Sequence, residues 1–290
     1  MDKSLNPHII LLASYPKSGN TWMRSFLGVL TNEENEISSF DELKSDWGIL
    51  SNRYLLDSFL GIKTSELTEQ EVQSLRFKAY EFGASHLKEA IFVKTHDTPF
   101  YEGIPIIPKS IVKEVILIVR NPFDMIASYA NHMNCSNERS LLNINSGNNA
   151  LAKSTKKFNN QVAQFMGSWS DFHNCWKNTF RDKVTVIRYE DMLNDSLITF
   201  KKVVDASKLN FSENQIQAAI DATRFDKLQK IEQEKGFKEK NTKTKQFFRQ
   251  GKAGNWRNEI TMDMANQIID RHYSTLLELN YIDPSGKILV

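Results

Sequence analysis

A short turn that follows an apolar segment carries residues that could hold an anion. It runs from Ser14 to Trp22 and reads SYPKSGNTW. Gly19 allows the backbone to approach an anion closely, successive N–H groups from Ser18 onward would point out of a helix N-terminus, and Lys17 adds a positive charge. These features predict a phosphate cradle. Because Lys17 precedes the glycine, the turn is not the Gly-x-x-x-x-Gly-Lys-Ser/Thr loop of ordinary ATP or GTP kinases.

Strand-like and helix-like segments alternate along the chain and must position this turn. The predicted buried strands are short and β-branched: His8 to Ser14, Ala90 to Lys94, Glu114 to Val119 and Val184 to Arg188. The predicted helices are Thr21 to Leu30, Thr68 to Phe82, Pro122 to His132, Phe158 to Trp176, Asp191 to Ala206, Ser212 to Ala222 and Thr261 to Leu279. This alternation predicts an α/β fold with a central parallel β-sheet flanked by helices on both faces.

Nothing in the sequence divides this fold, because there is neither a linker nor a repeat, so residues 1–290 are predicted to form a single domain. In such a sheet, ligands bind at the carboxyl ends of the strands, which is where the turn lies. Two polar stretches fit no core element, Asn134 to Asn160 and Glu232 to Gln246. Their composition predicts solvated mobile loops, with a lid over a site as the alternative.

The composition disfavours several classes of protein. The 37 Lys and Arg against 35 Asp and Glu give a net charge of +2, which disfavours nucleic-acid and membrane partners. Cys135 and Cys175 form no Cys-x-x-Cys pair, so free thiols and a cytoplasmic location are predicted. No stretch approaches the ~18 apolar residues of a membrane span. His132 and His173 lie near these cysteines, but their spacing is not a zinc signature, and no metal is predicted.

Four motifs resemble, in the same order, those of the PAPS-dependent sulfotransferases of the cytosolic type. PAPS is 3′-phosphoadenosine-5′-phosphosulfate, the sulfuryl donor of that family. The turn from Tyr15 to Trp22 is similar to the family's 5′-phosphosulfate loop. The other motifs are Lys94-Thr95-His96, Arg120-Asn121-Pro122-Phe123-Asp124 with Ser128, and the segment from Phe248 to Trp256. The resemblance implies a P-loop-like sulfotransferase fold. It also implies transfer of a sulfuryl group to a hydroxyl or amine of a small molecule, which leaves adenosine 3′,5′-bisphosphate (PAP).

The resemblance also assigns the residues that hold the donor. Arg120 and Ser128 would bind its 3′-phosphate together with Arg249, a suitable set for a phosphate dianion. Trp22 and Phe225 would lie on the two faces of the adenine. The full donor-binding set is Lys17, Ser18, Gly19, Asn20, Thr21, Trp22, Arg120, Ser128, Tyr189, Thr223, Phe225, Phe248, Arg249, Gln250 and Gly251.

By the same resemblance, His96 is the base that removes the acceptor proton. Lys17 would stabilise the leaving phosphate, and Lys94 would offset the charge on the migrating sulfuryl group. Ser128 would also hold Lys17 away until the donor binds. Asp97 is an alternative base, or the group that orients His96. A histidine base predicts that activity falls on acidification.

The sequence departs from the family pattern in two places. Asn20 replaces the commoner threonine, and one more residue separates the Lys-Thr-His element from the next proline than in many eukaryotic members. The family's dimer motif is degraded, with Arg257, Thr261, Met262 and Asn266 at its positions. A monomer and a homodimer are therefore both kept as predictions.

Residues 53–57 and 60–68 look more like bacterial members of the family, which suggests a bacterial enzyme of small-molecule biosynthesis. Candidates for contact with the acceptor are Phe100, Tyr101, His86 and the stretch from Asn134 to Asn160. Two alternative functions stay open. One is a P-loop-like small-molecule kinase, and the other is a non-catalytic nucleotide-binding protein.

Overall fold

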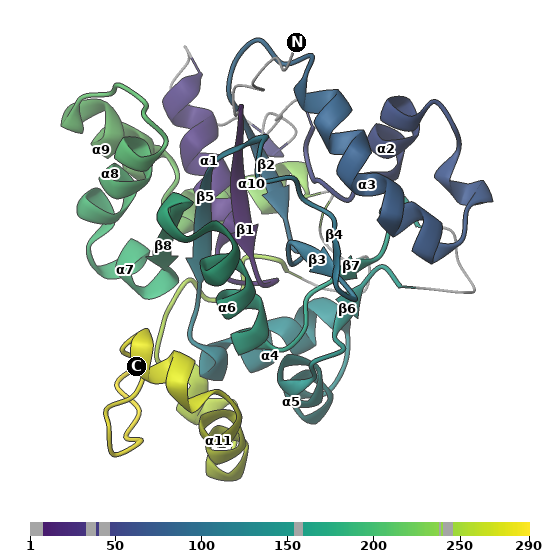
Figure 1. Cartoon of the computed structure of the whole chain (residues 1–290). Helices are drawn as coiled ribbons and strands as arrows, with labels where there is room; N and C mark the ends of the chain where they lie inside the picture. The colour runs from purple at the N-terminus through teal and green to yellow at the C-terminus, as the bar shows by residue number, and fades with distance from the viewer. Residues whose placement is uncertain (1–7, 33–38, 41–46, 154–158, 238, 240–245) are drawn as a thin grey trace. The chain divides into compact units, whose positions relative to one another are not determined.

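A central four-stranded sheet has the strand order β2-β1-β5-β8 (Figure 1). The computed structural model describes residues 8–32, 39–40, 47–153, 159–237, 239 and 246–290. The strands are β1 (Ile9–Ser14), β2 (Ile91–Thr95), β5 (Val112–Val119) and β8 (Val184–Arg188). β1 and β2 run parallel, with Ile9 opposite Ile91 and Ala13 opposite Thr95. The predicted α/β fold is confirmed, and each strand lies within two residues of its predicted bounds.

The chain falls into two compact units, each built from three segments. The first unit comprises residues 1–13, 45–117 and 147–186, and the second comprises residues 14–44, 118–146 and 187–290. The chain passes from the first unit to the second near the carboxyl ends of β1, β5 and β8. The single domain expected for residues 1–290 stays a prediction.

The first unit holds most of each strand together with helices and two short hairpins. Its helices are α2 (Arg53–Leu60), η2 (Thr64–Glu66), α3 (Glu69–Ala84), α6 (Trp169–Phe180) and η3 (Arg181–Lys183). Its hairpins pair β3 (Phe100–Tyr101) with β4 (Ile104–Pro105), and β6 (Ala150–Leu151) with β7 (Gln164–Phe165). Thr68 and Glu71 form a capping box at the start of α3, where the sequence predicted a helix to begin.

The helix predicted from Phe158 to Trp176 is wrong in its first half. Phe158 lies outside the described residues, and residues 159–168 contain β7 and non-helical backbone. Gly167 has a φ of 67°, which interrupts a right-handed helix. Ser168 then caps α6 by accepting a hydrogen bond from the Asp171 N–H. The helix therefore begins at Trp169.

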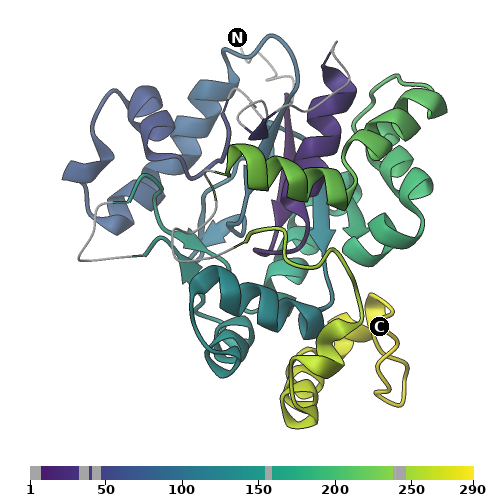
Figure 2. The ribbon, with the colours of Figure 1, turned by 180° about the vertical axis from the view of Figure 1, so that it is seen from behind.

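The second unit is mostly helical in its described part. Its helices are α1 (Asn20–Thr31), α4 (Pro122–Met133), α5 (Asn137–Asn145), α7 (Tyr189–Asn194), α8 (Ser196–Ala206), α9 (Glu213–Ala222), α10 (Phe225–Lys235), η4 (Asn255–Asn258) and α11 (Met262–Glu278). Figure 2 shows α8 and α9 packed side by side. The predicted helix from Asp191 to Ala206 is divided at Asp195, whose φ of −131° and ψ of 54° are not helical. No helix in the described part of either unit is long and apolar enough to cross a membrane.

The two polar stretches predicted as loops contain regular structure. Asn134 to Asn160 includes α5 and β6; α5 is capped by Ser136 and buries Leu141 and Ile144. The stretch from Glu232 to Gln246 begins inside α10, and most of its remainder lies outside the described residues. The polar composition of α5 and α10 did not indicate a helix, because each helix buries only a few side chains. A lid function for Asn134 to Asn160 stays a prediction.

Candidate functional site

The turn after β1 has a backbone that only certain residues tolerate. Lys17 has a φ of 70° and Gly19 a φ of 104°, immediately before α1 begins at Asn20. A Cβ atom at Gly19 would lie 2.7 Å from Cδ2 of Tyr189. The buried Asn20 amide donates a hydrogen bond to Ser14 Oγ at 3.2 Å, which joins the two ends of the turn. The turn therefore presents the first N–H groups of α1 on a fixed backbone, as an anion site requires.

Gly19→Ala is expected to destabilise the protein by about 1–3 kcal/mol, because alanine would meet both an unfavourable φ and the Tyr189 ring. Gly61 provides the matched control, since its φ is 69° and a Cβ there would meet nothing within 4 Å. Gly61→Ala thus tests backbone strain alone. Thermal unfolding of both variants measures the difference. Equal losses of stability would show that the Tyr189 ring does not exclude a side chain at Gly19.

The Lys17 side chain lies against an aromatic ring of the same unit. Its Nζ is 3.3 Å from the centroid of the Phe247 ring and donates to the Phe247 carbonyl at 3.5 Å. An ammonium group over an aromatic face is stabilised by the ring quadrupole. Ser128, the partner expected from the sequence before donor binding, is buried in α4. In this structure the ammonium group is held at Phe247, a residue that no motif indicated.

Arg120 links the turn to the glycine-bearing segment near the C-terminus. Its guanidinium donates to the carbonyl of Lys17 at 3.3 Å and to that of Lys252 at 3.3 Å. The same group lies 4.5 Å from the centroid of the Tyr189 ring. Burial raises the pKa of Tyr189, and the Arg120 charge opposes that rise. The neutral Tyr189 ring therefore packs against both Gly19 and the Arg120 guanidinium.

Two buried carboxylates hold these segments in place. Asp124 accepts hydrogen bonds from the N–H groups of Gly254 at 2.7 Å and Trp256 at 2.8 Å. Glu190 accepts from the Asn121 N–H at 3.0 Å and from its side-chain amide at 2.7 Å. Asp124 lies within a motif of the resemblance and Glu190 follows the predicted donor contact Tyr189, but their role in bracing the loops was not predicted. An acidic residue that is buried requires hydrogen-bond partners, so the position of these two acids beside predicted site residues was the signal for such contacts.

The predicted adenine-contacting aromatics share one cluster. Phe40, Leu228 and Phe248 form its buried centre, and Trp22 and Phe225 pack against it. The Phe225 ring lies directly on the backbone of Gly251, where any Cβ would overlap the ring. At Gly251 this glycine-bearing segment thus depends on close approach to the Phe225 ring.

Three other predicted donor contacts have internal partners. Thr223 is fully buried, and its hydroxyl donates to the Ala219 carbonyl at 2.8 Å. Arg249 forms a two-point ion pair with Glu259, with Nη2 at 2.7 Å from Oε2. Gln250 also donates to Glu259, at 3.2 Å. Glu259 is a further residue that the sequence did not indicate.

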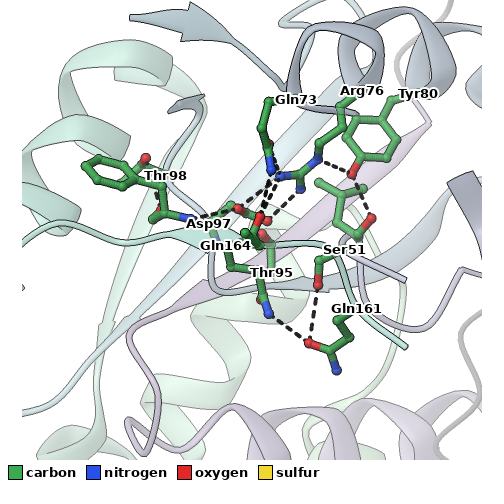
Figure 3. Close-up of polar contacts among 12 residues, drawn as sticks. Ser51, Gln73, Arg76, Tyr80, Thr95, Asp97, Thr98, Gln161 and Gln164 are labelled. Carbon is green, nitrogen blue, oxygen red and sulfur yellow. Dashed lines mark hydrogen bonds and ion pairs between the residues drawn. The ribbon is translucent and has the colours of Figure 1, made fainter. Parts of the chain in front are cut away.

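The predicted base lies in the first unit. His96 follows β2 and is buried, with 9% of its surface exposed. The next residue, Asp97, is fully buried and pairs with Arg76 of α3 through two bonds of 3.1 and 2.6 Å (Figure 3). Burial raises the pKa of the Asp97 carboxyl, while the Arg76 charge opposes the rise. Since both carboxylate oxygens accept from Arg76, this geometry favours a positioning role for Asp97 over the role of base.

Arg76 and Asp97 also organise the chain around His96. Arg76 donates to the Tyr80 hydroxyl at 2.9 Å and to the Gln73 side-chain oxygen at 2.8 Å (Figure 3). Asp97 accepts from the Phe165 N–H at 3.2 Å, and its carbonyl accepts from the Trp176 indole. A largely buried network thus anchors the backbone next to His96 to α3, α6 and β7.

The described residues contain no group of three or more metal-ligating His, Cys, Asp or Glu side chains. The predicted donor-binding residues all belong to the second unit, and Lys94 and His96 belong to the first. Among the predicted acceptor contacts, Tyr101 packs edge-on against Phe165 at 5.9 Å between ring centroids. His86 is exposed just beyond the end of α3, and its Nδ1 lies 2.9 Å from the Phe82 carbonyl of that helix.

Comparison with protein families finds one model that matches residues 7–280, described as the sulfotransferase domain. The flavonol 3-sulfotransferase of Flaveria bidentis is 21% identical over 276 residues, which cover 91% of this chain and 80% of that protein. Cytosolic sulfotransferase 15 of Arabidopsis thaliana is 26% identical over 271 residues, which cover 89% of this chain and 69% of that protein.

Solved structures show the same fold. A mouse sulfotransferase complexed with PAP superposes with a TM-score of 0.58 at 19% identity, covering 95% of this chain and 90% of that chain. A retinol dehydratase in complex with androsterone and the inactive cofactor PAP gives a TM-score of 0.57 at 20% identity. That match covers 97% of this chain and 84% of the dehydratase chain.

Proposed function

Because the chain belongs to the sulfotransferase domain family, we propose that it transfers a sulfuryl group from PAPS to a hydroxyl or amine of a small molecule. The observation that carries this proposal is the bridge made by Arg120 between the Lys17 turn and the Lys252 segment. A single guanidinium thereby joins the turn that suits the 5′-phosphosulfate to the segment that suits the 3′-phosphate. The relative named for flavonols supports a small-molecule acceptor.

The residues present fit an adenine nucleotide with phosphates on two positions. Gly19 and Gly251 both lie where a side chain would overlap an aromatic ring. In both segments the nucleotide would therefore be contacted by the backbone rather than by a side chain at the glycine. Backbone N–H groups at the start of α1 suit the 5′-phosphate end, and Arg120 and Arg249 suit the 3′-phosphate. Trp22 supplies an aromatic face for the base.

The transfer requires one proton acceptor and charge stabilisation. We assign His96 to accept the proton of the acceptor hydroxyl or amine as its new bond to sulfur forms. The bond between sulfur and the phosphate oxygen breaks in the same exchange, and the charge left on that oxygen is balanced by Lys17. Lys94 offsets charge on the migrating group.

PAP is expected to bind at least about tenfold more tightly than ATP, because only PAP carries the 3′-phosphate that the arginines suit. Isothermal titration with each nucleotide measures this, together with an acceptor screen with PAPS read by mass spectrometry for an added sulfuryl group. Arg120→Ala should remove most of the preference for PAP. Arg224→Ala is the control, since Arg224 is exposed and pairs with Asp226.

Tighter binding of ATP would instead support the small-molecule kinase. Binding of PAP without transfer to any acceptor would support the non-catalytic nucleotide-binding protein. A cytoplasmic location agrees with the free cysteines Cys135 and Cys175 and with relatives named cytosolic sulfotransferases. The bacterial origin, the biosynthetic role and the choice between monomer and homodimer stay predictions.

A further inference from the structure

Arg249 is held by an acidic residue in the described structure. Its two terminal nitrogens contact the two carboxylate oxygens of Glu259, and Gln250 donates to the same carboxylate. The side chains of Arg249 and Glu259 are 30% and 14% exposed. The carboxylate therefore receives several donors and lies mostly out of water, where screening of its charge is reduced.

The position of Glu259 is fixed by its backbone. Its N–H donates to the Trp256 carbonyl at 2.9 Å, and its own carbonyl accepts from the Asn137 side-chain amide at 2.8 Å. Trp256 is in turn held by Asp124. The acid is thus anchored to η4 and α5 rather than placed on a freely moving loop.

A carboxylate and a phosphate offer an arginine the same geometry. Each presents two oxygens that accept parallel hydrogen bonds from the guanidinium fork. While Arg249 is paired with Glu259, its charge is balanced, and these two nitrogens are occupied. A phosphate dianion that approaches Arg249 must either displace the carboxylate or accept its repulsion.

We propose that Glu259 is an internal competitor for the 3′-phosphate and so sets how tightly this chain holds its nucleotide. The inference rests on the proposed function, because it takes Arg249 as a contact of the 3′-phosphate. Competition at this position weakens binding of PAP and PAPS, and it favours release of the PAP product. It leaves nucleotides without a 3′-phosphate unaffected.

Glu259→Gln tests the proposal, because glutamine keeps the size of the side chain and removes its charge. Titration should show PAP binding about tenfold more tightly to the variant than to the unaltered chain. Adenosine 5′-monophosphate lacks the 3′-phosphate, and its dissociation constant should change by less than about twofold. The matched control is Glu213→Gln, which removes a carboxylate from an exposed pair with Lys201 and should change neither constant.

A second variant separates competition from a general change of charge. With Arg249→Ala already present, Glu259→Gln should no longer tighten PAP binding, because no arginine is released. Weaker PAP binding in Glu259→Gln alone would overturn the proposal and show that Glu259 aligns Arg249. Equal tightening of both nucleotides would also overturn it. If the unaltered chain binds no PAP, the proposed function fails first, and this inference fails with it.

Discussion

His96→Ala is expected to lower kcat by about 10²–10⁴-fold, the range typical of a lost general base. The dissociation constant for PAP should change by less than about twofold, because His96 is assigned to the acceptor proton and is not among the proposed donor-binding residues. Steady-state kinetics with PAPS and an identified acceptor, together with titration with PAP, measure the two effects. A large loss of kcat with an unchanged dissociation constant for PAP is the result that identifies a base.

His8→Ala is the matched control for this experiment. His8 is also in the first unit, but it directly precedes β1, at the opposite end of that strand from the Lys17 turn. It should retain nearly full turnover. A His96→Ala protein that is folded, binds PAP normally and keeps full turnover would remove His96 from the mechanism.

Local sequence signals predicted the sheet and most helix starts. The four strands of the sheet are short apolar runs with β-branched residues, which is the pattern typical of buried strands. Thr68, Asn121, Ser212 and Thr261 each cap a helix, and the side chain of each accepts a hydrogen bond from a backbone N–H of the first turn. Such signals are readable because the residues that make the contact are neighbours in the sequence.

Helices with few apolar residues were not predicted. In α5, sequence NERSLLNIN, the buried Ser140 donates its hydroxyl to the Ile126 carbonyl of α4 at 2.8 Å. The helix is held by that contact and by a few buried side chains, so its own composition resembles that of a loop. In α10, the buried Glu232 accepts from the N–H groups of Phe247 and Phe248, which a run of charged residues does not indicate.

The candidate site likewise contains residues that the sequence indicated and residues that it did not. Gly19, Arg120 and His96 were indicated by motif and by position after a strand. Phe247 and Glu259, which now hold the side chains of Lys17 and Arg249, were not indicated. Their pairing depends on how distant segments pack, and a sequence motif records which residues a ligand needs rather than which residues compete for them.

Breaking the buried ion pair between Arg76 and Asp97 is expected to cost about 3–5 kcal/mol of the free energy of unfolding. Both side chains are fully buried, so Asp97→Asn would leave the permanently charged guanidinium without its counter-charge. Urea unfolding followed by circular dichroism measures the loss. Lys78→Ala is the control, because Lys78 pairs with Glu81 at the surface and should cost less than about 0.5 kcal/mol.

A paired substitution tests what the ion pair contributes beyond stability. Arg76→Met with Asp97→Leu removes both charges and should be less destabilising than Asp97→Asn alone, because no unpaired charge stays buried. If the pair also holds the backbone beside His96, the stable double variant should still show lower kcat, with its affinity for PAP unchanged. Full kcat in that variant would limit Arg76 and Asp97 to a structural role. A loss of less than about 1 kcal/mol in Asp97→Asn alone would contradict the buried charge pair itself.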